Sequence, residues 1–112
     1  MRSAHKLTFV IAALVFNLCG VVCHGADSIH VLIWDERQPR QNQAYDDYLG
    51  NEIAKRLQAS TDDMDIRSVS LDDAEQGLGA GNLEWADVIV WWGHVRQNEI
   101  TEATAKLIAE QQ

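Results

Sequence analysis

The chain has 112 residues, and its 17 Asp and Glu against 9 Lys and Arg give a formal net charge of −8. This acidic balance argues against nucleic acid as a partner, because proteins that bind a phosphate backbone carry basic surfaces. Acidity of this degree is typical of a soluble protein surface, and the length suffices for one small domain.

Residues 1–25 have the layout of a secretory signal peptide. A basic segment at 2–6 precedes an almost wholly apolar stretch at 7–22, and small residues then lead to a possible cleavage site before Ala26. The alternative is an uncleaved membrane anchor, for which the apolar stretch is short, since a span needs about 20 residues. We therefore expect a secreted or periplasmic protein, with no stable membrane association once the signal peptide is removed.

The mature segment, residues 26–112, has no cysteine, because Cys19 and Cys23 both lie in the predicted signal peptide. An exported protein of this kind must fold on core packing without disulfides, and it has no thiol nucleophile. Its formal charge is −10, since 17 acidic side chains stand against 7 basic ones once Arg2 and Lys6 are removed.

The first half of the mature segment predicts a strand, a helix and a second strand. The continuous apolar run at 28–34 is rich in β-branched residues and predicts a buried strand. A polar loop with the only proline, Pro39, follows. Apolar residues at three- and four-residue steps then predict a helix over about 44–59, and the diluted apolar run at 64–70 predicts a partly exposed edge strand.

The second half predicts a loop, a third strand and a helix. We expect residues 71–84 to form a loop with at most a helical turn. Its glycine-rich part, 77–81, does not match a dinucleotide fingerprint, which lies directly between a strand and a helix, and indicates a flexible loop. The run at 87–92 is typical of a strand buried on both faces, and a helix follows near residue 100.

The alternation of strands and helices predicts an α/β fold with a parallel sheet and right-handed crossovers. A flavodoxin-like sheet of this kind has the strand order two-one-three. Ligands of such sheets bind between the carboxyl ends of strands one and three, where the chain connections leave on opposite faces. We therefore expect the functional site at this edge.

Six residues converge on this edge in the predicted fold: Trp34, Asp35, Glu36, Trp92, Gly93 and His94. His94 is the strongest candidate, because imidazole titrates near neutrality and can act as acid, base or metal ligand. We expect His94 and Asp35 to be catalytic and the other four to bind substrate.

Each of these residues also has a purely structural interpretation. Asp35 can cap the following loop, Glu36 can be a solvated charge, Trp34 can belong to the core, and His94 can be a turn residue bonded to the backbone. His30 lies at the opposite end of the first strand. No spacing typical of a metal site occurs within one element, so no metal site is predicted there. The alternative is a site to which His94 and Asp35 contribute together, and the sequence leaves the cofactor unknown.

These residues resemble the trehalose-utilisation (ThuA-like) family. Its members open with a strand ending in Trp-Asp-Glu, as at 34–36, and carry an Asp-Val-x-x-Trp-Trp-Gly-His element, matched at 87–94. The Leu-Asp-x-x-x-x-Gly-Leu stretch at 71–78 is also similar to the family's. The match runs in order through nearly all of residues 29–112.

The resemblance implies a fold similar to class I glutamine amidotransferases, a flavodoxin-like sandwich, but without their cysteine nucleophile. Family members are generally about twice this length, so residues 26–112 correspond to the amino-terminal part of such a domain, truncated before its later strands. The family is linked to the use of trehalose and related disaccharides through their oxidised keto forms. The partner implied is a small-molecule sugar.

Three functions follow as expectations. The first is an exported ThuA-like protein of disaccharide metabolism, in which His94 is an acid, base or ligand group and Asp35 orients it or binds a hydroxyl. The second is a non-catalytic carbohydrate-binding module that uses the same crevice, where indoles and carboxylates suit a sugar. The third is an inactive truncated product. We also expect the third strand to lie at an open sheet edge, through which the chain can self-associate.

Overall fold

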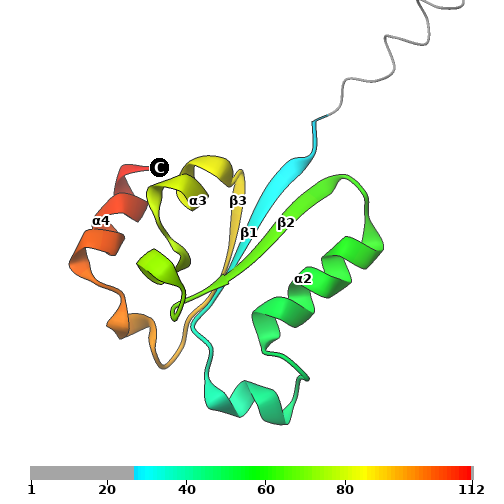
Figure 1. The fold of residues 1–112 in the computed structure, drawn as a ribbon, viewed down its shortest axis with the longest axis horizontal. Coiled ribbons are helices and arrows are strands. Elements are labelled where there is room, and N and C mark those ends of the chain that lie inside the picture. Colours follow the sequence, from blue (N-terminus) through cyan, green and yellow to red (C-terminus); the bar gives the residue numbers. More distant parts are fainter. Residues whose placement is uncertain (1–26, 112) are drawn as a thin grey trace, which may run out of the picture.

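The computed structural model describes residues 27–111, in which three parallel strands form one open sheet with helices on both faces (Figure 1). The strands are β1 (Ile29–Asp35), β2 (Met64–Ser70) and β3 (Val88–Trp92), in the order β2-β1-β3. This architecture and strand order confirm the flavodoxin-like α/β fold predicted from the sequence. The predicted signal peptide lies outside the described residues.

β1 is the central strand because its continuous apolar run can be buried on both faces. Residues 31–34 are at most 4% exposed. The parallel register places Asp35, the last residue of β1, beside Ser70 of β2 and Trp92 of β3. The carboxyl ends of all three strands therefore meet at one edge, as the predicted site requires.

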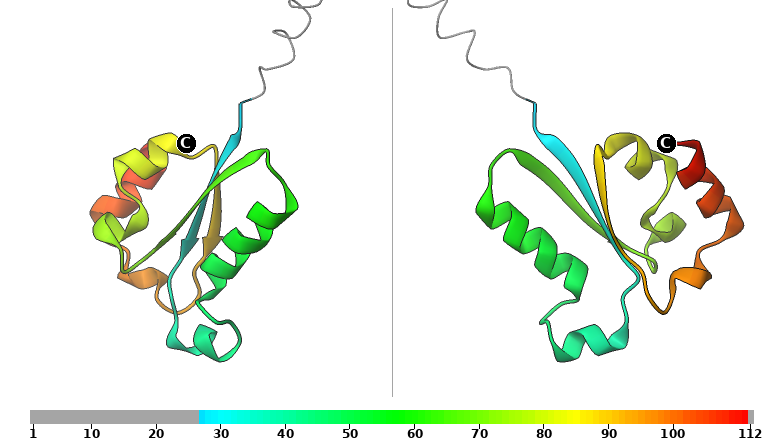
Figure 2. Two further views of the ribbon diagram at one scale, coloured as in Figure 1. Left: turned by 45° about the vertical axis from the view of Figure 1, so that its right-hand side comes forward. Right: turned by 180° about the vertical axis from the view of Figure 1, so that it is seen from behind.

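Helix α2 (Leu49–Ser60) packs on β1 and β2 (Figure 2). Its residue Ala54 completes a buried cluster with Val31 and Ile33. The helix begins at Leu49 and not near residue 44, so the apolar periodicity predicted its start wrongly. Two local features explain the difference. The proline loop forms a separate 3-10 helix, η1 (Pro39–Gln43), and Tyr48 has a left-handed φ of 56°, which a right-handed helix cannot include.

The opposite face of the sheet is covered by α3 (Ala80–Trp85) and α4 (Glu102–Glu110) (Figures 1 and 2). The buried cluster on this face consists of Leu32, Trp34, Leu71, Leu78 and Leu83. α4 follows a short 3-10 helix, η3 (Gln97–Glu99), and its N-cap is Thr101, whose hydroxyl accepts a hydrogen bond from the backbone nitrogen of Thr104.

Residues 71–84 are structured to a greater extent than the sequence predicted. They contain the 3-10 helix η2 (Ala74–Gly77) and most of α3. The burial of Leu71, Leu78 and Leu83 holds this segment on the sheet, and their spacing follows neither the helical nor the strand period, which is why the pattern predicted a loop. Gly77 and Gly79 are buried within this segment.

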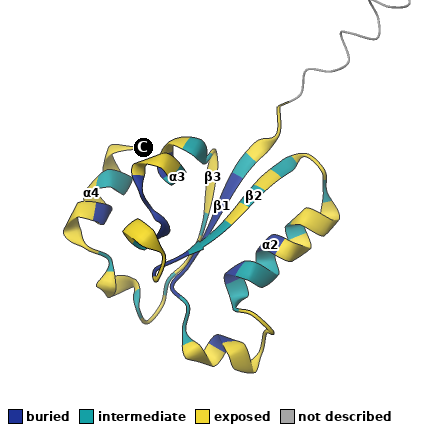
Figure 3. Cartoon of the chain, viewed as in Figure 1, coloured by how far each residue is buried: buried dark blue, intermediate teal, exposed yellow. Residues whose placement is uncertain are grey.

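β3 forms one edge of the sheet, and most of its residues are coloured as exposed (Figure 3). Because successive strand residues point to opposite faces, apolar side chains are exposed on both faces of β3. Val88, Ile89, Trp91 and Trp92 are each between 39% and 47% exposed. The sequence pattern of a strand buried on both faces is therefore not fulfilled within residues 27–111. Across the same residues, no helix is both long enough and apolar enough to cross a membrane.

Candidate functional site

A cleft of about 450 Å³ opens at the carboxyl edge of the sheet, between the loop after β1 and the loop after β3. Its lining residues are Gln38, Pro39, Arg40, His94, Val95 and Arg96. The cleft therefore lies where open α/β sheets bind their ligands. His94 is exposed there, and its imidazole accepts or donates no hydrogen bond within residues 27–111.

Glu36 fixes the loop that carries His94. Its carboxylate is fully buried and accepts hydrogen bonds from the backbone nitrogens of Val95, at 2.8 Å, and Arg96, at 2.5 Å. The side chain of Gln38 donates to the same carboxylate. Consecutive backbone N–H groups that converge on one anion form a nest, and here the anion belongs to the protein itself.

The charge of Glu36 is strongly stabilised by this arrangement. Burial acts to raise its pKa, but hydrogen bonds from the backbone of Val95, the side chain of Gln38 and the backbones of His94 and Arg96 outweigh burial. They lower the pKa from 4.5 to about 2. Glu36 is thus a buried, ionised positioning residue. Since none of its atoms is exposed, it cannot contact a substrate as the sequence led us to expect.

Arg96 is a second organising residue of the cleft, which the sequence analysis did not single out. Its guanidinium donates to the backbone oxygens of Glu36, at 2.8 Å, and Arg37, at 2.9 Å, and it pairs with the carboxylates of Asp72 and Glu99, each at 2.8 Å. One planar group thereby joins the loop after β1, the segment after β2 and η3. An Arg two residues after His94 gave no sequence signal of this role.

Asp35 lies at the same edge but faces α2. Its carboxylate accepts hydrogen bonds from the backbone nitrogens of Arg37, at 2.8 Å, and Gly50, at 2.7 Å, and from the side chain of Gln41, at 2.8 Å. Because it is only 2% exposed, it is a structural carboxylate that joins η1 to the amino terminus of α2. Asp35 therefore fits the alternative interpretation, a cap on the following loop, and within residues 27–111 its carboxylate neither orients His94 through a hydrogen bond nor faces a substrate.

Trp34 belongs to the core and does not line the cleft. Its side chain is 0% exposed, stacks on Trp91 with ring centroids 4.0 Å apart, and donates from Nε1 to the backbone oxygen of Gln76 at 2.8 Å. Of the two interpretations of Trp34, the structure therefore favours the core residue. A substrate would reach this indole only if the core opened.

Trp92 and Gly93 lead from β3 into the His94 loop. Trp92 is 42% exposed, and its backbone oxygen accepts a hydrogen bond from the backbone nitrogen of Glu36 at 3.1 Å. A Cβ atom at Gly93 would lie 2.7 Å from Nε1 of Trp91 and 3.0 Å from Oε1 of Gln97. A larger residue at Gly93 would therefore require the side chains of Trp91 and Gln97 to move.

The structure thus brings the six predicted residues to one edge but divides them by role. No hydrogen bond joins Asp35 to His94 within the described part of the chain, and the carboxylate that meets the His94 loop is that of Glu36. His30 lies at the other end of β1, where it stacks on Trp85 with centroids 4.7 Å apart. Within residues 27–111, no three His, Cys, Asp or Glu side chains gather as metal ligands.

The fold and the cleft define an α/β protein with an open parallel sheet and a candidate ligand site at its topological switch point. No protein-family model matches the chain, and no curated protein matches it.

Proposed function

We propose that this chain binds a small sugar in the cleft at the carboxyl edge, as an exported ThuA-like protein of trehalose or disaccharide metabolism. In this proposal His94 is the acid or base that acts on a keto form of the sugar. The motifs Trp-Asp-Glu at 34–36 and Asp-Val-x-x-Trp-Trp-Gly-His at 87–94 support it, since they resemble those of that family.

One observation carries the proposal: the imidazole of His94 has no hydrogen-bond partner among the described residues, while hydrogen bonds to Glu36 hold the backbone of its loop in place. His94 lines the cleft, and the next two backbone nitrogens are bound by the buried carboxylate of Glu36. A group that transfers protons gains from such fixed placement, because the substrate then meets it in a constant geometry. The exposed guanidinium of Arg40 on the facing wall can bind sugar hydroxyls.

NMR titration of the isotope-labelled chain tests the ligand class. Trehalose and a keto-disaccharide should shift the backbone amide signals of residues 38, 40 and 94–96 and leave those of α2 unchanged. His94→Ala should weaken the interaction, and His30→Ala, at the opposite end of the sheet, should leave it unchanged. A titration in which no sugar moves the cleft signals would overturn the proposal.

A second candidate function, a non-catalytic carbohydrate-binding module, is favoured by the state of the two carboxylates. Asp35 and Glu36 are 2% and 0% exposed and have their hydrogen bonds inside the protein. Among the described residues that line the cleft, His94 is therefore the one whose side chain is of a type that serves as a general acid or base. Conversion of a keto-disaccharide that His94→Ala abolishes, with a far smaller loss of binding, supports the enzyme. Binding by the unmodified chain without conversion supports the module.

A further inference from the structure

The cleft at the carboxyl edge is lined by cationic and donor side chains and by no carboxylate. Arg40 and Arg96 are cationic, His94 has a ring N–H, and none of the lining residues is acidic. This lining is the reverse of the composition of the chain, in which 17 acidic side chains outnumber 9 Lys and Arg. A sugar hydroxyl donates as well as accepts, and a carboxylate is the strongest acceptor that a protein offers it. The cleft therefore favours a ligand with strong acceptors of its own.

The carboxylates near the cleft are already used within the protein. Asp35 and Glu36 are 2% and 0% exposed and accept hydrogen bonds from the loops around them. Asp72 and Glu99 each pair with the guanidinium of Arg96 at 2.8 Å, and neither lines the cleft. Arg96 is thus neutralised and holds the structure together, which leaves Arg40 as the cation that faces a ligand.

Arg40 is exposed and pairs with no carboxylate within residues 27–111. A guanidinium binds a carboxylate or a phosphate through two parallel N–H bonds, and its planar shape makes this contact specific. A solvated arginine on an open surface would need no ligand, but Arg40 lies on one wall of a cleft whose other wall presents His94.

The backbone on both sides of the cleft is fixed by the two successive carboxylates at the end of β1. On one wall, Gln41, the residue after Arg40, is buried and donates to the carboxylate of Asp35 at 2.8 Å. On the other wall, the two backbone nitrogens that follow His94 donate to Glu36. Two donors without partners are therefore presented from fixed positions, which lowers the cost of ordering them around a ligand.

We propose that the ligand of this cleft is a sugar that carries an oxyanion, either a carboxylate or a phosphate group. Arg40 binds the oxyanion, and the sugar ring lies between Arg40 and His94. The inference rests on the proposed function, since it takes the cleft as the sugar site, and it adds the class of sugar. Neutral sugars bind to the same cleft more weakly, because they lack the group that pairs with the guanidinium.

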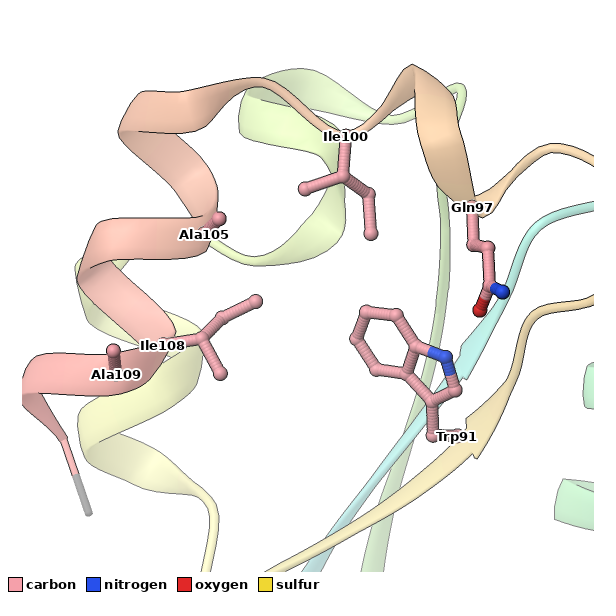
Figure 4. Close-up of a pocket in the computed structure, with 6 residues that line it drawn as sticks. All are labelled: Trp91, Gln97, Ile100, Ala105, Ile108 and Ala109. Atoms are coloured by element: carbon pink, nitrogen blue, oxygen red, sulfur yellow. The ribbon is translucent and has the colours of Figure 1, made fainter.

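A second hollow, between β3 and α4, has the opposite chemistry. It measures about 430 Å³, and Figure 4 shows the indole of Trp91 facing Ile100 and Ile108 across it. None of its lining residues is charged: Trp91, Gln97, Ile100, Ala105, Ile108 and Ala109. An oxyanion placed there would lose its hydration without a cation to replace it. This hollow is therefore an internal reference for anion binding in the cleft.

NMR titration of the full chain with glucose, glucuronate and glucose 6-phosphate tests the class of sugar. The three probes differ in the group at carbon six. We expect an acidic probe to bind about tenfold more tightly than glucose, and added salt to reduce this difference. Whether glucuronate or glucose 6-phosphate binds more tightly identifies the oxyanion. Signals at residues 38, 40 and 94–96 should shift, and those of Ala105 and Ala109 should not. Equal affinity for all three probes would overturn the inference and leave the proposed function standing.

Arg40→Gln tests the guanidinium. It should lower the affinity for the preferred acidic sugar about tenfold, and it should change the affinity for glucose by less than about twofold, because glutamine still donates to a hydroxyl. Arg56→Gln removes the same charge from the exposed face of α2 and should leave both affinities unchanged. An equal effect of the two substitutions would attribute the preference to net charge and would overturn the inference.

Inorganic phosphate separates the failure of this inference from the failure of the proposed function. If no sugar binds but phosphate shifts the signals of residues 40 and 94–96, and Arg40→Gln abolishes that shift, the oxyanion site at Arg40 is supported and the sugar proposal fails. If neither the sugars nor phosphate move these signals, both are overturned.

Discussion

The carboxylate of Asp35 accepts a 2.7 Å hydrogen bond from the backbone nitrogen of Gly50 in the first turn of α2. This contact joins the end of the central strand to the start of the helix that covers it. A carboxylate is well placed there, because the first N–H groups of a helix lack partners within the helix and its dipole favours negative charge. The approach is so close that residue 50 has no room for a side chain.

Gly50→Ala should therefore destabilise the protein, although alanine is the better helix former. The added Cβ would lie 2.8 Å from Cβ of Asp35 and 3.1 Å from its Oδ2. We expect the free energy of unfolding to fall by about 1–3 kcal/mol, the usual cost of overpacking. Urea unfolding followed by circular dichroism measures it.

Gly81→Ala is the matched control for this prediction. Gly81 is an exposed residue of α3, and a Cβ atom there would meet no atom within 4 Å. The substitution should be neutral or should stabilise by up to about 1 kcal/mol, because alanine loses less backbone freedom in a helix than glycine. Equal destabilisation at both positions would show that the contact with Asp35 is not the cause.

The stability of the protein should fall in acid through Glu36. Its pKa is lowered from 4.5 to about 2 on folding, so the unfolded chain binds a proton at Glu36 more readily than the folded chain does. The stabilisation is complete above about pH 4.5 and is lost as the pH falls toward 2. The denaturation midpoint in urea, measured at pH 7 and between pH 4.5 and 2, reports this loss.

Glu36→Gln should lower the stability at pH 7 and flatten the acid dependence. The amide keeps one acceptor oxygen but turns an NH₂ group toward the backbone nitrogens of Val95 and Arg96, at a cost of about 1–3 kcal/mol. Glu84→Gln, on the exposed side of α3, is the control and should retain the pH dependence of the unmodified chain. An unchanged acid slope in Glu36→Gln would contradict the assignment.

The fold could be predicted from the sequence because each strand carries its own pattern of burial. The continuous apolar run at 28–34 and the diluted run at 64–70 specify a central and an edge strand without knowledge of distant residues. The start of α2 could not be predicted in this way. Tyr45 and Tyr48 satisfy the helical period, but the left-handed φ of Tyr48 ends the preceding segment, and periodicity does not detect it.

The position of the site was also predictable, whereas the roles of its carboxylates were not. Topology places Asp35 and Glu36 at the carboxyl edge, but their side chains bind backbone nitrogens at Gly50 and at Val95, which is 59 residues away from Glu36. The tertiary fold determines which backbone N–H groups come close enough to donate to each carboxylate. The importance of Arg96 has the same origin, since its partners come from three separate segments.

Arg96→Lys should loosen the cleft although it preserves the charge. A lysine ammonium cannot donate at once to the backbone oxygens of Glu36 and Arg37 and to the carboxylates of Asp72 and Glu99, as the guanidinium does. We expect a loss of about 1–2 kcal/mol in unfolding free energy and faster amide exchange at residues 94–96.

Arg56→Lys is the control for Arg96→Lys. Arg56 is exposed on α2 and pairs only with Glu52 one turn earlier, within the described residues. Exposed pairs of this kind contribute little to stability, so the substitution should leave the unfolding free energy nearly unchanged and exchange at 94–96 unaltered. Comparable losses in both variants would remove the special role of Arg96.

Trp34→Phe should destabilise the protein through a hydrogen bond and not through lost aromatic packing. Phenylalanine can still stack on Trp91, but it cannot donate to the backbone oxygen of Gln76, which receives Nε1 of Trp34 at 2.8 Å. That oxygen belongs to a residue with a left-handed φ of 56°, so the bond also holds a strained backbone. An unsatisfied buried acceptor costs about 1–3 kcal/mol.

Trp92→Phe, at a position 42% exposed on the open edge, should cost less than about 0.5 kcal/mol, as surface substitutions usually do. If urea unfolding gave the same loss for both tryptophans, the bond to Gln76 would not be what holds η2 against the sheet.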